Sequence, residues 1–573
     1  MKSVVALAAA LNAAIAFGFQ REQVDPRTRT YVYPERIAWA SDGLKAEELL
    51  LPRHGQVPEA GWGQLHPPSG CRLANDVRHK AVVVDFGREI HGGVQLAFAA
   101  GSAGQKVRVR FGESLSEALS DIGKQGASND HAIRDDVVTA PAMGTRELGN
   151  TGFRFVYIDI QTEGSVTLEF VRAVSLMRPM RRLGGFRSSD DRLNRIFETA
   201  VRTVHLCCQD YLWDGIKRDR LVWMGDMHPE TMGVLRVFGA QDILPSSLDL
   251  MAAVTPPDEW MNTMGPYTLW WLRNIAEWYR FTGDRAYLAR HGDYIRRTFE
   301  NLSNHMTASN TLEGIRRPFL DWQTEHNREA VHAGVQALAL VTCREGEFLA
   351  KELGDEGLGE TCRSMASRLE TLKGRLSPNN SKQAAAMLAL SGMEDPKAMY
   401  EAVLGENGHS GVSTFYGYYM LEAMSMAGED QRALDTVRDY WGAMLDVGAT
   451  SFWEDFDIGW TNNCFRIDQL PVDGKKDIHG DYGEFCYTGF RRSLCHGWSC
   501  GPAAWLIEHV LGIRPVDVGC KTVMVRPFLG DLEWAEGAMA LPDGQRVCVR
   551  VEKSVAGEMK VKVDAPYGVR IVR

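Results

Sequence analysis

The stretch SSDDRLNRIFETAVRTV, residues 188–204, marks the point at which the hydrophobic pattern of this chain changes from a period of two to the period of a helix. Ser189 and Asp190 are residue types that cap helices, and the acidic side chains here suit the positive end of a helix dipole. The apolar residues that follow recur at the i, i+3, i+4 and i+7 positions of one helical face. They are Leu193, Ile196, Phe197, Ala200, Val201 and Val204. The stretch therefore predicts the first amphipathic helix of a helical domain.

Helical patterns continue from this stretch to about residue 511. The segment from Gly265 to Thr282 has an apolar face, ends at Gly283 and is followed by Asp284, so that a C′ glycine stands beside an N-cap. Roughly a dozen helices with short polar loops and no fixed-period repeat favour a closed toroid of paired antiparallel helices over a solenoid. The other periodic segments are 331–353, 361–376, 383–390, 414–427, 433–445 and 502–511. We therefore expect one helical domain over residues 186–511.

Strand patterns lie on both sides of the helical segment. Val107, Val109 and Phe111 alternate with charged neighbours, as on a strand with one buried face, and they predict a β-sandwich over residues 25–180. Over residues 512–573 the period returns to two, which predicts a small β-domain. Three domains suit a length of 573 residues, because a single hydrophobic core stops growing at about 250–300 residues.

The composition disfavours some classes of partner. A net charge of −10 disfavours binding to nucleic-acid phosphates, which requires clustered lysine and arginine. Beyond the N-terminus no stretch reaches the roughly 18 apolar residues of a membrane span, so no membrane partner is expected. The eleven cysteines include no C-x-x-C pair, and we expect no metal, no cofactor and no regular disulfide framework. The sequence leaves the oligomeric state open.

The first residues, MKSVVALAAALNAAIAFGFQ, have the layout of a secretory signal peptide, with one lysine, a short apolar run and small residues around Ala14 and Ala16. We expect residues 1–19 to be a signal peptide and the protein to be periplasmic or secreted. An ordinary N-terminal helix is the alternative. Asn12 within the apolar run and the odd number of cysteines favour that alternative.

The densest group of chemically active side chains is DGIKRDRLVWMGD, residues 214–226. It holds three carboxylates and two arginines, and Trp213 directly precedes it. The spacing of Asp214, Asp219 and Asp226 matches neither the strand period nor the helix period, so a packing face does not explain the pattern. The alternatives are a functional loop and a solvated loop with incidental charges.

This string resembles, without a gap, the signature D-[CG]-x-x-R-[DE]-R-x-x-W-x-G-D of glycoside hydrolase family 78, the α-L-rhamnosidases. Further stretches resemble the same family in the same order. They are VRVRFGESLSEAL (107–119), TGFRFVYIDI (151–160), FLDWQ (319–323), GATSFWEDF (448–456) and SLCHGWSCGPAAWL (493–506). The resemblance covers the chain from about Tyr31 to the C-terminus. It implies an (α/α)6 barrel as the catalytic domain, with the β-sandwich before it and the small β-domain after it.

The resemblance also implies roles for particular residues. Asp219 falls on the general-acid position, where many relatives carry Glu and some carry Asp, and Glu454 falls on the general-base position. The residues expected to bind the sugar are Asp214, Arg218, Trp223, Asp226, Trp260, Asp321, Trp322, Trp453 and His496.

Several assignments keep an alternative. Asp455, Asp457, Glu259 and Glu484 lie close to aromatic residues in the sequence and compete with Glu454 for the role of base. For His496 a buried structural role is the alternative to sugar binding. We expect structural roles for His91 and His228.

The implied activity is the exo-acting removal of terminal α-L-rhamnose with inversion. An inverting glycosidase needs one protonated carboxylic acid for the leaving oxygen and one ionised carboxylate to activate water on the opposite ring face. The like charges of Asp214 and Asp226 would raise the pKa of the acid, while Arg218 would lower it. The alternatives are another (α/α)6-barrel glycosidase or phosphorylase, or a sugar-binding relative without catalysis. The sequence does not identify the aglycone.

Overall fold

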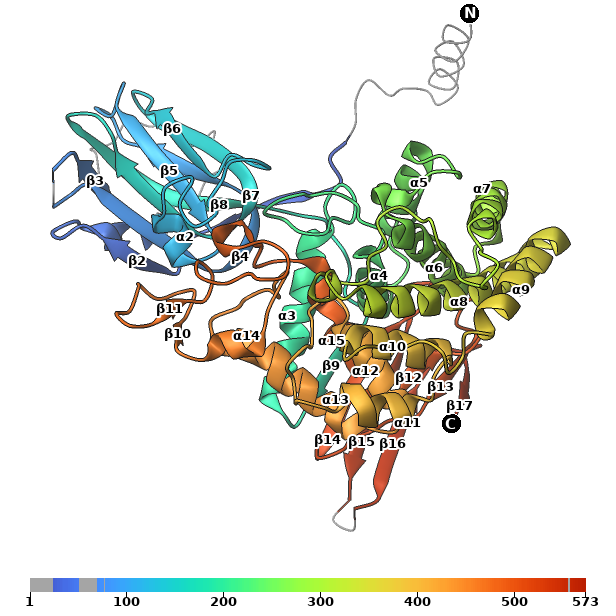
Figure 1. Cartoon of the computed structure of the whole chain (residues 1–573). Helices are drawn as coiled ribbons and strands as arrows, with labels where there is room; N and C mark the ends of the chain where they lie inside the picture. The colour runs from blue at the N-terminus through green and yellow to red at the C-terminus, as the bar shows by residue number, and fades with distance from the viewer. Residues whose placement is uncertain (1–23, 51–69, 77, 555–556) are drawn as a thin grey trace, which may run out of the picture.

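The protein is described here by a computed structural model that covers residues 24–50, 70–76, 78–554 and 557–573. Along the chain it forms a β-sandwich, a helical domain and a C-terminal region of sheets, which Figure 1 shows from blue to red. The expected signal peptide, residues 1–19, lies outside the described residues. The sandwich, the helices and the C-terminal sheets occur in the predicted order.

Two long strands build both layers of the sandwich. These strands are β4 (Ala81–Phe98) and β7 (Gly144–Ile160), which pair antiparallel along most of their lengths. The first half of β4 pairs with β2 (Arg36–Ala40) and the second half with β8 (Ser165–Met177). The register of β4 shifts between these halves, as expected where a bulge bends a strand from one layer into the other. The apolar residues enclosed between the layers form one core.

The alternation that predicted the sandwich corresponds to strand β5 (Lys106–Gly112). Val107, Val109 and Phe111 are buried in the core between the layers. The remaining elements of the domain are β1 (Thr28–Val32), η1 (Ala46–Leu50), β3 (Cys71–Ala74), α2 (Leu115–Leu119) and β6 (Asp135–Thr139).

Six helices of the second domain close into a ring. Each contacts the next, and the last contacts the first. They are α4 (Met227–Val237), α6 (Gly265–Thr282), α8 (Arg328–Leu353), α10 (Lys382–Ser391), α12 (Gly417–Met426) and α15 (Gly501–Trp505), the last continued by η10 (Leu506–Val510). The closed toroid predicted from the helix patterns is therefore present.

A second layer of helices lies outside this ring. Its members are α3 (Asp191–Cys207), α5 (Ile243–Val254), α7 (Arg285–Asn304), α9 (Glu356–Glu370), α11 (Pro396–Met399) with η5 (Tyr400–Leu404), and α13 (Asp430–Thr436) with η6 (Val437–Trp441) and α14 (Gly442–Asp446). The two layers differ in burial: every residue of α4 is buried, whereas α7 buries one face. An inner helix is covered on all sides, so only outer helices need an amphipathic pattern.

The predicted helix boundaries agree with the capping contacts. The side chain of Asp190 accepts hydrogen bonds from the amides of Arg192 and Leu193 at the start of α3. Helix α6 ends at Gly283, which has a φ of 67°, and Asp284 then caps α7 by accepting from the amide of Tyr287.

The C-terminal region contains two sheets, one of which includes a strand from far earlier in the chain. Strand β9 (Gly185–Ser188), which we expected at the start of the helical domain, pairs antiparallel with β14 (Trp534–Ala540). Strands β15 (Arg546–Lys553) and β16 (Met559–Asp564) complete this sheet. The other sheet contains β12 (Ile513–Pro515), β13 (Thr522–Val525) and β17 (Arg570–Val572). This pairing ties both ends of the helical domain together.

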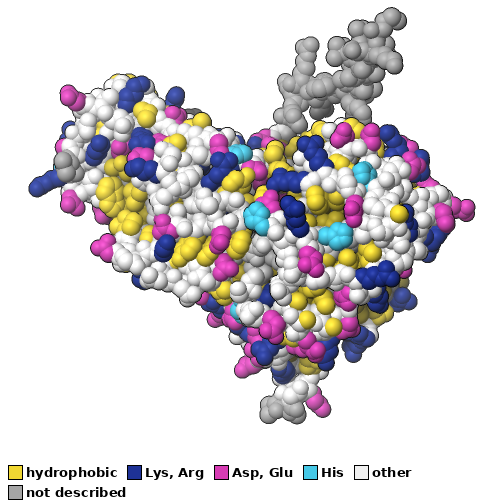
Figure 2. Space-filling view, viewed as in Figure 1, with side chains coloured by type: hydrophobic (Ala, Val, Ile, Leu, Met, Phe, Trp, Pro, Cys, Tyr) yellow, Lys and Arg dark blue, Asp and Glu magenta, His cyan; other side chains and the backbone are white. Residues whose placement is uncertain are grey.

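Loops between the helices contain several short elements. They are η3 (Met261–Thr263), η4 (Trp322–Thr324), η7 (Ile458–Thr461), β10 (Cys464–Phe465), β11 (Lys476–Asp477), η8 (Gly489–Arg491) and η9 (Gly497–Cys500). Among the described residues, no helix is both long and apolar enough to cross a membrane. Basic and acidic side chains are interspersed over the face seen in Figure 2.

A substitution at Gly283, where α6 ends, tests whether this position requires glycine. Gly283→Ala places a Cβ on a residue with a φ of 67°, so we expect a loss of unfolding free energy of about 1–2 kcal/mol. Gly357→Ala is the matched control, because Gly357 is exposed in the first turn of α9, where alanine favours the helix by up to about 1 kcal/mol. Denaturant unfolding measures both. Equal effects of the two changes would contradict the role given to Gly283.

Candidate functional site

A pocket of about 150 Å³ contains most of the residues that the sequence singled out. Eight of the eleven expected catalytic and sugar-binding residues line it: Asp214, Arg218, Asp219, Trp223, Asp226, Trp322, Glu454 and His496. They come from segments around residues 214–226, 322, 454 and 496, which are far apart in the sequence. The pocket therefore exists only once the helical ring has closed.

Three expected sugar-binding residues lie elsewhere. Trp260 packs edge-on against His305, with ring centroids 5.0 Å apart. Asp321 is buried and accepts a hydrogen bond from the Ser413 hydroxyl. Trp453 is fully buried beside Glu454 and packs against the Phe456 ring instead of lining the pocket. A direct contact of these three with a sugar stays a prediction, and their present contacts support the surrounding loops.

The sequence reasoning missed several residues that line the pocket. They are Met264, Tyr267, Arg317, Phe319, Cys486, Tyr487 and Trp498. Trp498 stands two positions after His496 within a stretch that had already been singled out, so its position gave a usable signal. Tyr267 is near the start of α6 and gave none, because a tyrosine in a buried helix is ordinary core composition.

The loop of residues 214–226 connects α3 to α4 and has an unusual backbone at its centre. Asp219 and Arg220 have φ values of 49° and 54°, which are uncommon for residues other than glycine. The Arg220 guanidinium donates to the backbone carbonyls of Asn150, at 2.8 Å, and His131. Both carbonyls belong to the β-sandwich. Contacts from another domain thus hold a strained turn at the predicted acid.

Arg218 joins the two predicted catalytic carboxylates. Its Nη1 lies 2.8 Å from Oδ1 of Asp219, and its Nη2 donates to Oε1 of Glu454. The two carboxylates therefore lie within roughly 8 Å of each other, the span of one guanidinium and two hydrogen bonds. The guanidinium also stacks on Tyr487, with its carbon 3.6 Å from the ring centroid.

Glu454 is held in its ionised form. Burial opposes ionisation, but the adjacent Arg218 guanidinium outweighs it and lowers the pKa of Glu454 to about 2. The Ser493 amide donates to Oε2 at 3.0 Å, and the Cys486 thiol lies 2.9 Å from Oε1. An ionised carboxylate at neutral pH is the form that a general base requires.

Asp214 and Asp226 show the opposite behaviour. Burial raises the pKa of Asp226 to about 8, although the Tyr267 hydroxyl donates to its Oδ2 at 2.9 Å. Burial and the nearby charges of Asp219 and Asp226 raise the pKa of Asp214 well above its usual range. A protonated carboxyl group can donate one hydrogen bond and accept another, as recognition of sugar hydroxyls requires.

His496 lies between these two carboxyl groups. Its Nε2 is 3.7 Å from Asp214 and 3.9 Å from Asp226, beyond direct hydrogen bonding. Burial lowers the pKa of His496 to about 3, so the ring is neutral, and its Nδ1 has no hydrogen-bond partner among the described residues. A buried polar atom without a partner beside a pocket is suited to receive a ligand hydroxyl.

The competing base candidates do not line this pocket. Asp455 faces the amide of Phe485 at 3.3 Å, and burial raises its pKa to about 7. Asp457 caps η7 through the amide of Gly459. Glu259 is exposed, and Glu484 lines a different cavity. Glu454 is the base candidate that shares a pocket with Asp219.

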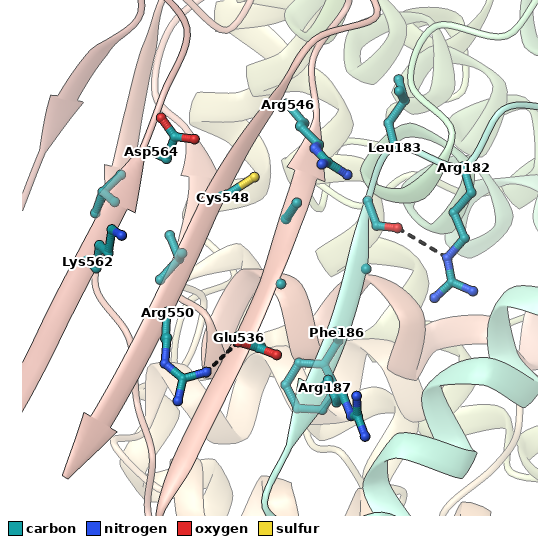
Figure 3. A pocket seen from close by; sticks show the side chains of 16 residues that line it. Arg182, Leu183, Phe186, Arg187, Glu536, Arg546, Cys548, Arg550, Lys562 and Asp564 are labelled. Atoms are coloured by element: carbon teal, nitrogen blue, oxygen red, sulfur yellow. Dashed lines mark hydrogen bonds and ion pairs between the residues drawn. The ribbon is translucent and has the colours of Figure 1, made fainter.

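A larger hollow of about 890 Å³ lies on the C-terminal sheet (Figure 3). It is lined by β9, β14, β15 and β16 and contains the carboxylates Glu536 and Asp564. Glu536 is paired with Arg550 at 2.5 Å, as the dashed line in Figure 3 shows. This open sheet face lacks a carboxylate pair joined by one cation, so the smaller pocket is the better candidate for the active site.

One group of potential metal ligands occurs among the described residues, and it is formed by Glu113, Glu117 and His479. The ammonium of Lys217 lies 2.8 Å from Glu117 and 3.3 Å from Glu113. Because a lysine cation already neutralises these carboxylates, the group does not fit a metal site.

Two models of bacterial α-L-rhamnosidase domains match the chain. The model described as the bacterial alpha-L-rhamnosidase concanavalin-like domain matches residues 75–176, within the sandwich. The model described as the bacterial alpha-L-rhamnosidase 6 hairpin glycosidase domain matches residues 181–357, which include the loop of residues 214–226. No curated protein matches the chain.

The fold is similar to those of solved rhamnosidases. The GH78 family rhamnosidase of Bacillus sp. GL1 has a TM-score of 0.73 at 22% identity, covering 92% of this chain and 55% of that one. The rhamnosidase from Klebsiella oxytoca with rhamnose bound has a TM-score of 0.66 at 20% identity, covering 84% and 96%. The Streptomyces avermitilis α-L-rhamnosidase complexed with L-rhamnose has a TM-score of 0.67 at 17% identity, covering 87% and 49%. This chain spans about half the length of the first and third.

The raised pKa of Asp226 predicts a pH dependence of stability. The folded protein keeps a proton that the unfolded chain releases above pH 4, so this carboxyl disfavours folding increasingly as the pH rises from about 4 to about 8. Asp226→Asn mimics the protonated form and should gain unfolding free energy relative to wild type between pH 5 and 8, on the order of a few kcal/mol.

Denaturant unfolding at several pH values measures this difference. Asp543→Asn, a change at an exposed hairpin carboxylate, is the control and should leave the pH dependence as in wild type. A pH-independent difference between Asp226→Asn and wild type would contradict a protonated Asp226.

Proposed function

We propose that this chain, a member of the α-L-rhamnosidases of glycoside hydrolase family 78, hydrolyses terminal α-L-rhamnosyl residues from the non-reducing end of a glycoside. The observation that carries the proposal is the pocket in which Arg218 joins Asp219 to an ionised Glu454. The small volume of the pocket suits one terminal sugar ring, as exo action requires.

In the proposed mechanism Asp219 protonates the leaving oxygen and Glu454 activates a water on the opposite face of the ring. Inverting enzymes separate these carboxyl groups by about 6.5–9.5 Å, and the upper limit of roughly 8 Å set by Arg218 overlaps that range. The low pKa of Glu454 supports its role as base. Asp219 is the more exposed of the two side chains, which suits a group that protonates a leaving group departing into solvent.

Aromatic walls suit the apolar parts of rhamnose. Trp223, Trp322 and Trp498 line the pocket together with Tyr267 and Phe319. The C6 methyl group and the apolar ring face of this sugar require such surfaces, while Asp214, Asp226 and His496 offer polar partners for its hydroxyls.

A panel of p-nitrophenyl glycosides tests the substrate. We expect release of p-nitrophenol from the α-L-rhamnoside and none from the other sugars, because the methyl-bearing ring matches the walls of the pocket. Release from a different glycoside would indicate another barrel glycosidase. Binding of L-rhamnose without release from any glycoside would indicate a non-catalytic relative.

Two isosteric variants test the catalytic pair. Asp219→Asn and Glu454→Gln should each lower kcat by at least about 10²-fold on a natural disaccharide, the usual scale for loss of a positioned acid or base. With p-nitrophenol as the leaving group little proton donation is needed, so Asp219→Asn should recover most of its activity and Glu454→Gln should not. Equal losses on both substrates would remove the role of acid from Asp219.

The stereochemical course is read in the same assays by NMR before mutarotation. Inversion predicts that the wild-type enzyme first releases β-L-rhamnose. Initial release of the α-anomer would exclude the water-activating role of Glu454 and leave it a nucleophile.

A further inference from the structure

A buried carboxylate of the β-sandwich lies directly behind the catalytic pocket. Glu113 belongs to the FGESLSEAL stretch, in the turn between β5 and α2, and its side chain has no exposed surface. It does not line the pocket. Its contacts reach instead to two loops of the helical domain, and each of these loops bears on one of the proposed catalytic carboxylates.

The first contact leads to Glu454. The Leu494 amide donates to Oε2 of Glu113 at 2.6 Å, and the Ser493 hydroxyl lies 3.2 Å from Oε1. Ser493 in turn binds Glu454 twice through its backbone. Its amide donates to the Glu454 carboxylate at 3.0 Å, and its carbonyl accepts from the Glu454 amide at 3.0 Å. Fixing Ser493 therefore fixes the orientation of the base.

The second contact leads to Asp219. The Lys217 ammonium lies 3.3 Å from Oε2 of Glu113, and Lys217 directly precedes Arg218 and Asp219. The same ammonium donates to the carbonyl of Arg492 at 3.0 Å, in the loop that carries Ser493. Lys217 thus links the two loops, and Glu113 contacts both.

Burial raises the pKa of Glu113, but the groups that face its two oxygens favour the carboxylate. An amide N–H, a hydroxyl and an ammonium group face its two oxygens, and all three can donate. Glu117 and Arg134 complete the group, with Arg134 3.1 Å and Lys217 2.8 Å from Glu117. The carboxylates of Glu113 and Glu117 are thus matched by the cations of Lys217 and Arg134 within the buried group.

We propose that Glu113 is a positioning residue through which the β-sandwich fixes the loops of Asp219 and Glu454 relative to each other. The assignment rests on the proposed roles of these two carboxylates. Misplacing a catalytic group by about 1 Å can cost about 10²-fold in rate, so a supporting residue outside the pocket can control kcat without touching the substrate.

Glu113→Gln tests the proposal on the full-length protein. Glutamine keeps the size of the side chain but removes the negative charge that pairs with Lys217, and its NH2 group replaces one of the two acceptor oxygens. We expect kcat to fall by about 10–100-fold with KM within about threefold of wild type, because the groups that bind the sugar are unchanged. The loss should persist with p-nitrophenol as the leaving group, since a good leaving group does not replace a base.

Asp85→Asn is the matched control. Asp85 is an equally buried sandwich carboxylate, paired with Arg154 and Arg36 at 2.8 Å each, and Arg154 donates to the carbonyl of Gly448 in the helical domain. It contacts neither the Lys217 segment nor the Ser493 segment. Asp85→Asn should lower the melting temperature of the protein and leave kcat per folded molecule unchanged.

Ser493→Ala is a second variant for the case in which Glu113→Gln does not fold. It removes the hydroxyl that faces Glu113 and keeps the backbone amide that binds Glu454, so a smaller fall in kcat with unchanged KM is expected.

The outcomes separate the two proposals. Wild-type kcat in folded Glu113→Gln, or losses of kcat that match those of Asp85→Asn, would overturn the positioning role while the activity of the wild type stands. If the wild type hydrolyses a different glycoside, the rhamnosidase proposal fails and Glu113 is judged on that substrate. Wild-type protein that hydrolyses no glycoside would overturn both.

Discussion

The ion pair and hydrogen bonds of one buried arginine decide the chemistry of the pocket. Arg218 contacts Asp219 and Glu454 through its two terminal nitrogens, donates through Nε to the carbonyl of Arg491 and stacks on Tyr487. Burying charges is costly unless each has a partner, and here every charge has one. The guanidinium sets the separation of the carboxylates and keeps Glu454 ionised in spite of its burial.

This contact depends in turn on the closure of the helical ring. Arg218 follows α3, Glu454 follows α14, and Tyr487 precedes α15, so these segments are far apart in the chain. The contact of α15 with α4 brings their loops together. A backbone bridge between Gly215 and His496, and a hydrogen bond of 2.7 Å from the Gly497 amide to the Asp214 carbonyl, then join the loops directly. The β-sandwich also contacts the loop of Arg218, because Arg220 donates to the carbonyl of Asn150 and Lys217 pairs with Glu113.

The pocket holds carboxyl groups in two protonation states within a short distance. Glu454 lies beside a cation and remains ionised, whereas Asp226 accepts a hydrogen bond from the Tyr267 hydroxyl, and burial raises its pKa to about 8. The difference arises from the neighbours, since both side chains are equally buried. The proposed hydrolysis uses this combination, with one group to activate water and others to donate and accept hydrogen bonds.

The sequence by itself determined the fold class, because periods of two and 3.6 are local properties that strands and helices impose on their own residues. The capping pair Gly283 and Asp284 even indicated where one helix ends and the next begins. The motif around Asp219 supplied five of the residues that line the pocket, since they lie close together in the chain. Only the tertiary structure revealed that β9 joins the C-terminal sheet, that Trp260, Asp321 and Trp453 do not line the pocket, and that Cys486 and Tyr487 do. Which side chain meets which across two hundred residues, and therefore which carboxyl is charged, depends on ring closure and domain packing, and no local pattern encodes these contacts.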